Sequence, residues 1–159
     1  MSLLLLLAIT TGCGFQLRGS FVFPKYLQNI YITPDDPYEP FQKGLCRALK
    51  QNNIQVVSEV NKNNVVLELT HPDFSESILA FNANGQAQIF RLAIYLQYQV
   101  NYNNKVLRPS TTIQYSRDFS LAPNQLLSGD NERRTIKDAL YQEAINMLLR
   151  QLSTLPAPE

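Results

Sequence analysis

The stretch from Gln86 to Tyr102, QAQIFRLAIYLQYQVNY, constrains the fold more than any other part of the chain. From Phe90 onward its even-numbered positions are all apolar or aromatic, whereas the odd-numbered positions are mixed and become more polar. A period of two is typical of a β-strand with one buried face. At about 3.3 Å per residue the stretch spans about 56 Å. Such a strand must bend, contain a bulge, or project beyond the core.

Turn-forming residues stand on both sides of this strand. Asn84-Gly85 precedes it and Asn103-Asn104 follows it. Asn and Gly tolerate the positive φ angles that two-residue hairpin turns need. The sequence therefore predicts an antiparallel meander over 74–82, 86–102 and 105–120. The register that follows from two-residue turns pairs Tyr102 with Lys105, Val100 with Leu107, Leu96 with Thr111, Ile94 with Ile113, Leu92 with Tyr115, Gln88 with Phe81 and Phe90 with Leu79.

The rest of the chain predicts shorter elements. Strands are expected at 29–33 and 65–71, with a possible edge strand at 54–58. One helix is expected to start near Pro37 or Pro40 and to end near Gln51, because proline suits the first helical position. A second is expected from about Asn131 to Leu152, with Asp130 as its cap. The predicted fold class is α+β: two helices packed on one face of a mainly antiparallel sheet of about four strands, including the long central meander.

Composition limits the classes of function. The chain has 159 residues, 45% hydrophobic and 17% charged, and this suits one domain, placed at 13–155. A net charge of +1 argues against a nucleic-acid partner. Two Cys and one His leave no disulfide framework and little for a metal site. Cys46 is interpreted as a small buried hydrophobe and His71 has no evident catalytic partner, so no catalytic residue and no cofactor is predicted.

The N-terminus predicts export and lipidation. Residues 1–12, MSLLLLLAITTG, contain a short apolar run followed by small residues, as in a secretory signal peptide. Cys13 follows at once, as in a bacterial lipobox, where the thiol and the new amine are acylated, palmitate being one such group. An ordinary signal, or a buried N-terminal strand with a structural Cys13, are the alternatives. At the other end, 156–159 is predicted to be a disordered tail.

Three segments in order resemble one family. The segment CGFQLRG at 13–19, the Asn84-Gly85-Gln86 turn with the long strand after it, and LLSGDNERRTIKDALYQEA from Leu126 resemble the LptE family of lipopolysaccharide-assembly lipoproteins. The resemblance implies a Gram-negative outer-membrane protein, lipid-anchored on the periplasmic side and bound inside the lumen of the barrel protein LptD. It implies a plug and chaperone subunit of the lipopolysaccharide translocon. The family can carry a basic residue before the Asn-Gly, where this chain has Ala83.

Two sets of candidate site residues follow. Basic residues proposed to meet lipopolysaccharide phosphates are Arg91, Arg133, Arg134 and Lys137. A cross-strand ion pair with Asp118 is the alternative for Arg91, and a solvated helix face balanced by Glu132 and Asp138 is the alternative for the other three. Residues proposed to contact the partner protein are Asn84, Gly85, Gln86, Tyr95 and Gln97.

Other functions remain open at this point. The same sequence features would also suit a lipoprotein adaptor of another envelope machine, which would have a different partner. A periplasmic ligand-binding protein or enzyme is a further alternative. An enzyme needs convergent titratable groups, and the sequence does not offer them.

Overall fold

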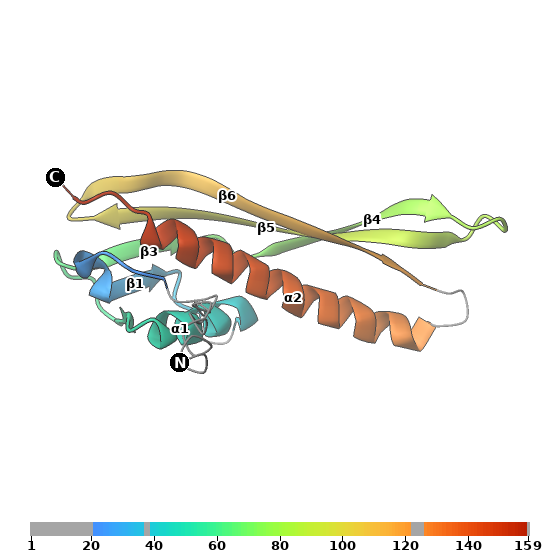
Figure 1. The fold of residues 1–159 in the computed structure, drawn as a ribbon, viewed down its shortest axis with the longest axis horizontal. Coiled ribbons are helices and arrows are strands. Elements are labelled where there is room, and N and C mark those ends of the chain that lie inside the picture. The colour runs from blue at the N-terminus through green and yellow to red at the C-terminus, as the bar shows by residue number, and fades with distance from the viewer. Residues whose placement is uncertain (1–20, 37–38, 122–125, 159) are drawn as a thin grey trace, which may run out of the picture.

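The structure is a computed structural model that describes residues 21–36, 39–121 and 126–158. The predicted signal peptide, Cys13 and Glu159 lie outside the described residues. In chain order the elements are η1 (Lys25–Gln28), β1 (Asn29–Thr33), α1 (Pro40–Gln51), β2 (Gln55–Val56), β3 (Val65–Leu69), β4 (Asp73–Phe81), β5 (Ala87–Tyr102), β6 (Lys105–Ser120) and α2 (Leu126–Ser153). Both helices lie on one side of the sheet, and the hairpin of β4 and β5 extends beyond them (Figure 1). The predicted α+β class is confirmed.

The sheet is larger than predicted, and it is mixed rather than mainly antiparallel. It has six strands in the order β2-β1-β3-β5-β4, with β6 also paired to β5. β1 is parallel to both β2 and β3, whereas β5 is antiparallel to β3, β4 and β6. The parallel pairs arise because α1 carries the chain back across the sheet after β1, as parallel strands require. The prediction of a mainly antiparallel sheet of about four strands was wrong because it did not follow this crossover, which brings β1 and β2 into one sheet with the meander.

β5 is the strand on which the others are assembled. Its first half pairs with β4 and its second half with β3, while β6 pairs with nearly all of it. Tyr98 pairs with both Leu69 and Thr111, so β3 and β6 lie along opposite edges of β5. Sixteen residues at about 3.3 Å each make β5 about 53 Å long. The long central strand with a partner on each side is confirmed.

The register of β5 against β6 differs from the prediction beyond the turn. The turn is as expected: Asn103 and Asn104 have φ of 51° and 60°, and Tyr102 pairs with Lys105. Two register shifts then occur on either side of Val100, which pairs with Arg108 rather than Leu107. One shift contains Pro109, which has no N–H to donate to a ladder and is therefore typical of a bulge.

The two shifts together move the pairing by two residues, which leaves every side chain on its predicted face. Leu96 therefore pairs with Ile113, and Leu92 pairs with Arg117. The predicted partners Thr111 and Tyr115 were wrong. Arg117 lies on the helix side of the sheet, where its guanidinium forms an ion pair with Glu143 of α2.

The β4–β5 turn also differs, because it has three residues instead of two. A backbone hydrogen bond closes the ladder at the turn, with Asn82 N donating to Gln86 O at 2.8 Å. Gly85 has φ of 76°, which a three-residue hairpin needs at its last position. Phe90 therefore pairs with Ile78, and Phe81 with Ala87. The predicted pairings with Leu79 and Gln88 were each wrong by one residue.

The two helices begin differently from one another. α1 starts at Pro40 as predicted, and the Glu39 carboxylate caps it by accepting from Gln42 N at 2.6 Å. α2 begins at Leu126, ahead of the expected Asn131, so Asp130 lies inside the helix and is not its cap. The apolar face of α2 reaches the sheet through side chains that are at most 2% exposed: Leu140, Ala144, Ile145, Leu148, Leu149 and Leu152. These side chains and the inward residues of β1, β3 and β5 form one core.

Candidate functional site

One side of the sheet carries no helix, and its side chains form the candidate site. We define the uncovered face by six residues that point away from α1 and α2: Arg91, Tyr95, Gln97 and Gln99 of β5, with Gln114 and Asp118 of β6. They alternate with the buried Leu92, Ile94, Leu96 and Tyr98. Alternation in an antiparallel pair places all six on the same side. The side of β5 that alternation predicted to be mixed and increasingly polar is therefore the side without helices.

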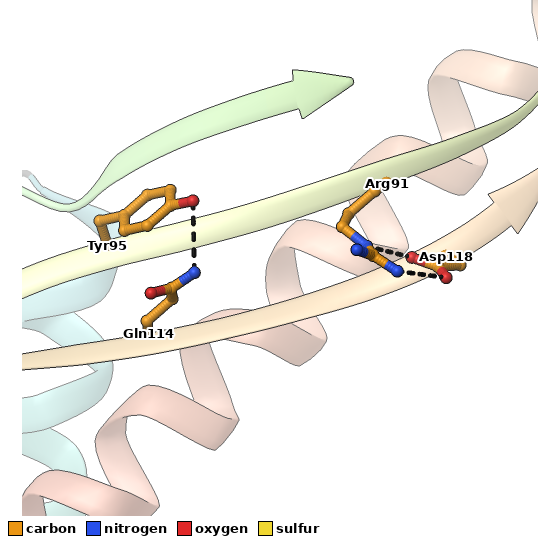
Figure 2. A network of polar contacts seen from close by, with 4 residues as sticks. All are labelled: Arg91, Tyr95, Gln114 and Asp118. Atoms are coloured by element: carbon orange, nitrogen blue, oxygen red, sulfur yellow. Dashed lines mark hydrogen bonds and ion pairs between the residues drawn. The ribbon is translucent and has the colours of Figure 1, made fainter. Parts of the chain in front are cut away.

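Arg91 and Asp118 form a charged pair on the uncovered face (Figure 2). Arg91 Nε donates to Asp118 Oδ1 at 2.7 Å, and Arg91 Nη2 donates to Oδ2 at 2.9 Å. The hydrogen bonds from Arg91 lower the pKa of the Asp118 carboxyl below its ordinary value. The ion-pair alternative for Arg91 is therefore what the structure contains. Its guanidinium already faces a carboxylate, so an anionic ligand here would compete with Asp118.

Neutral polar contacts continue along the same face. Gln114 Nε2 donates to the Tyr95 hydroxyl at 3.3 Å (Figure 2). Gln97 N donates to Thr70 Oγ1 at 2.9 Å, which ties β5 to the chain between β3 and β4. Farther along, Asn101 Nδ2 donates to Glu68 Oε1 at 2.8 Å. This surface presents amides, hydroxyls and paired charges, which suit a polar partner surface more than a small-molecule pocket.

The other predicted partner residues lie at the tip of the β4–β5 hairpin. Asn82 Oδ1 accepts from Asn84 N and from Gln86 N, both at 2.9 Å, and these bonds hold the turn in shape. Asn84, Gly85 and Gln86 are exposed. The structure thus divides the five predicted partner residues into two places, with Tyr95 and Gln97 farther down β5 than the tip.

Arg133 packs on the helix side of this hairpin. Its Nε and Nη2 donate to the two carboxylate oxygens of Glu76 at 2.8 and 3.0 Å. Its guanidinium also lies 5.5 Å from the centre of the Phe90 ring and 5.6 Å from that of Phe119. The hydrogen bonds with Glu76 raise the pKa of Arg133 above its ordinary value. Arg133 therefore joins α2 to β4, β5 and β6.

The four predicted lipopolysaccharide residues do not form one cluster. Arg91 is on the uncovered face, whereas its neighbour Phe90 faces Arg133 on the opposite side. Lys137 Nζ lies 5.1 Å from the centre of the Phe74 ring, and Arg134 is exposed without an ion pair among the described residues. Because α2 begins at Leu126, the cations lie in its second turn and beyond. These cations therefore do not stand beside the free N–H groups of the first turn of α2.

Sequence reasoning missed the stacked rings of Phe90 and Phe119, over which Arg133 lies, and the exposed apolar side chains of the hairpin. Ile78, Leu79, Phe81 and Ile89 are between 38% and 63% exposed. The available signal was the length of the strand, since the end of a projecting hairpin has no helix to cover its apolar residues.

We expect Arg133→Gln to lower the free energy of unfolding by about 1–2 kcal/mol. It loses the Glu76 pair and two cation–π contacts at a site where the Arg133 side chain is 29% exposed. Arg134→Gln, with the same loss of charge at an exposed position, should change it by less than about 0.5 kcal/mol. Urea denaturation followed by circular dichroism measures both. Equal effects would contradict the structural role of Arg133.

Other candidate groups give no catalytic arrangement among the described residues. His71 is exposed after β3, and the half-buried Cys46 has a raised thiol pKa because of burial. Within the described ranges no three His, Cys, Asp or Glu side chains gather as a metal site would need. None of the described helices combines the length and apolarity required to cross a bilayer.

Comparison with known proteins identifies relatives over the whole chain. The family model described as LptE, lipopolysaccharide-assembly, matches residues 27–152. Proteins named LPS-assembly lipoprotein LptE from Yersinia pestis (strain Pestoides F) and Yersinia pseudotuberculosis serotype O:1b are 29% identical over 162 aligned positions, covering 100% of this chain and 78% of each relative.

Solved structures share the fold. Rare lipoprotein B from Shewanella oneidensis aligns with a TM-score of 0.69 at 20% identity, covering 79% of this chain and 95% of that one. Lipoprotein B from Nitrosomonas europaea aligns with a TM-score of 0.69 at 23% identity, covering 88% and 90%. A minor lipoprotein from Acinetobacter baumannii aligns with a TM-score of 0.67 at 12% identity, covering 84% and 97%.

Proposed function

The chain belongs to the LptE family of lipopolysaccharide-assembly lipoproteins, and on that premise we propose that it is the plug and chaperone subunit of the outer-membrane lipopolysaccharide translocon, bound inside the lumen of LptD. The observation that carries the proposal is the uncovered face. An outer-membrane barrel has a polar interior. A sheet that buries one side under two helices and presents Tyr95, Gln97 and Gln114 on the other offers a matching polar surface.

The proposal assigns two contact regions to the partner. The uncovered face would meet the lumen wall through amide and hydroxyl groups, and the hairpin tip at Asn84, Gly85 and Gln86 would reach past the helices to a second contact. The apolar side chains near the tip, such as Phe81 at 63% exposure, support a partner there, because exposed apolar patches mark interaction sites. The protein would work by binding and positioning, without catalysis.

Anchoring completes the proposed arrangement. Cys13 would carry the acyl chains that hold the protein in the outer membrane on the periplasmic side. Several acyl chains give firm attachment, since each buried CH₂ contributes about 0.8 kcal/mol. The described domain begins only a few residues later, at Phe21, so the anchor keeps it near the membrane in which its partner barrel lies.

Copurification tests the proposal. The full-length chain, tagged at its C-terminus, is purified from native membranes in mild detergent, and the proteins retained with it are identified by mass spectrometry. A stoichiometric LptD band is expected. Recovery of a different envelope machine would favour the adaptor function instead, and recovery of the chain alone would contradict both.

Lipopolysaccharide contact is proposed at the cations whose donors are least occupied. Arg133 is held by Glu76 and Arg91 by Asp118, so Arg134 and Lys137 are the better candidates for lipid phosphates. We expect Arg134→Glu to weaken lipopolysaccharide binding by about fivefold to tenfold, since a charge-assisted hydrogen bond is worth about 1.5–3 kcal/mol before solvent screening. Surface plasmon resonance with immobilised lipopolysaccharide measures the change.

The matched control is Lys62→Glu, a charge reversal of the same size in the loop before β3. Equal losses of lipopolysaccharide binding in both variants would mean that net charge causes the effect. Unchanged binding of Arg134→Glu would mean that Arg134 lies on a solvated helix face and does not contact lipopolysaccharide.

A further inference from the structure

We infer that the outward face of α1 is a contact surface for an anionic phospholipid membrane. Lys43, Arg47 and Lys50 are exposed and are spaced by four and three residues, so they lie along one side of the helix. α1, from Pro40 to Gln51, contains no Asp or Glu. We call these three side chains the basic face of α1. This surface goes beyond the function proposed above, which uses the other side of the sheet.

The opposite side of α1 is fixed to the core. Phe41, Leu45 and Leu49 are at most 1% exposed. A Cβ on Gly44 would come within 2.9 Å of Ile145 Cδ1, so the helix lies close against α2 at this point. Because the buried side cannot turn outward, the basic face must point away from the body of the protein.

Nearby carboxylates do not neutralise the basic face. Lys43, Arg47 and Lys50 form no ion pair with another described residue. Glu39, at the start of α1, is engaged by Gln42 N and by the Tyr141 hydroxyl at 3.4 Å. Burial, followed by the charge of Glu39, raises the pKa of Tyr141 to about 12, so that hydroxyl remains a donor. Asp35 also lies near α1: its Oδ1 accepts from Gln42 Nε2 at 3.2 Å, and burial, followed by the charge of Asp35, raises the pKa of the Cys46 thiol. Three cations face these carboxylates without forming an ion pair with them, so the basic face keeps a net positive charge.

Apolar side chains border the last turn of α1. One groove is lined by Lys50, Cys46, Ile54 and Val56, and the next by Phe21, Phe23 and Lys25. The two grooves share Asn53 and Ile54, so they form a continuous surface. Val22 and Val56 in this region are 89% and 40% exposed. Cations beside exposed apolar groups are typical of surfaces that rest in the headgroup layer of a bilayer.

The position of this surface suits a membrane. The described chain begins at Phe21, in the same region, eight residues after Cys13. Eight extended residues reach at most about 29 Å, so an acylated Cys13 would hold this surface close to the lipid. α1 and the uncovered face lie on opposite sides of the sheet (Figure 1). α1 also lies toward the end of the molecule opposite the tip of the β4–β5 hairpin (Figure 1). The tip and the uncovered face can therefore enter the barrel lumen while α1 stays at its mouth, beside the lipid.

Vesicle binding tests the inference. The mature chain carrying Cys13→Ala, which has no acyl anchor, is mixed with vesicles of phosphatidylglycerol and phosphatidylcholine, and the bound fraction is measured by flotation. Each basic residue near an anionic surface is worth about fivefold in partitioning. Adding Arg47→Gln and Lys50→Gln is therefore expected to reduce the partition coefficient by about 25-fold. Vesicles of phosphatidylcholine alone should bind both proteins weakly and equally.

The control adds Lys62→Gln and Lys105→Gln, which removes the same charge from two exposed positions, in the loop before β3 and at the first residue of β6. An equal reduction in this control, or a reduction seen with lipopolysaccharide micelles but not with phosphatidylglycerol vesicles, would overturn the inference. Copurification of LptD with each variant is measured in parallel. Its retention when vesicle binding is lost separates this surface from the proposed plug function.

Discussion

Leu148→Ala is expected to lower the free energy of unfolding by about 2–5 kcal/mol. The Leu148 side chain is fully buried where α2 packs on the sheet, and it belongs to the single core of the protein. Truncation removes its transfer free energy and leaves a cavity that neighbours fill only in part. Urea denaturation of the non-acylated chain measures the change, with circular dichroism as the probe.

Val106→Ala is the matched control, because it also truncates an aliphatic side chain but at a position that is 58% exposed. We expect this variant to change stability by less than about 0.5 kcal/mol. Comparable losses for the two variants would mean that the helices do not define the single core side of the sheet.

Tyr95→Glu is expected to weaken binding to LptD by about thirtyfold or more while the fold is kept. Tyr95 is 36% exposed and lies in the middle of the uncovered face. Buried tyrosines at the centre of an interface often contribute about 2 kcal/mol or more to the binding free energy. A new carboxylate there would also lose its hydration on binding and gain no partner of opposite charge. The yield of LptD copurified with the tagged variant measures the effect.

Two further variants interpret that result. Gln142→Glu places the same new charge on an exposed position of α2, and LptD binding should be unchanged. Tyr95→Phe keeps the ring and loses only the hydroxyl that accepts from Gln114, so its binding should fall much less. A loss of binding in Gln142→Glu equal to that in Tyr95→Glu would point to charge in general and not to the uncovered face.

The sequence predicted the elements whose periodicity is strong. β5 and the Asn103-Asn104 turn followed from alternation and turn chemistry, and α1 followed from Pro40 and one apolar face. These features depend on residues that are close together in the chain, so they can be predicted from a single sequence. The polar side of β5 was predicted for the same reason, since alternation assigns each side chain to a face before any partner strand is known.

The errors arose where the structure depends on contacts between segments that are far apart in the sequence. The shift around Val100 depends on how β6 accommodates Pro109 beside β5, and a two-residue slip leaves the hydrophobic pattern unchanged. The parallel pairing of β1 with β3 depends on where α1 directs the chain. Asp130 was the clearest capping residue in this part of the sequence, so the start of α2 was predicted after it and not at Leu126.

The candidate site shows the same division. Opposite charges at Arg91 and Asp118 offered a cross-strand pair as the alternative to lipopolysaccharide binding by Arg91, and the structure contains this pair. Arg133 was grouped with Arg134 because they adjoin in sequence. The two differ only in the folded protein, where Arg133 packs over Phe90 and Phe119 and Arg134 is exposed.

Photo-crosslinking inside cells tests the central claim most directly. A photoreactive amino acid is placed at Tyr95 on the uncovered face, and in a second protein at Gln142 on the exposed side of α2. A covalent adduct with LptD from position 95, stronger than any from position 142, is the predicted result. Adducts of equal yield from both positions, or none from position 95 in a chain that still copurifies with LptD, would contradict the assignment of the uncovered face.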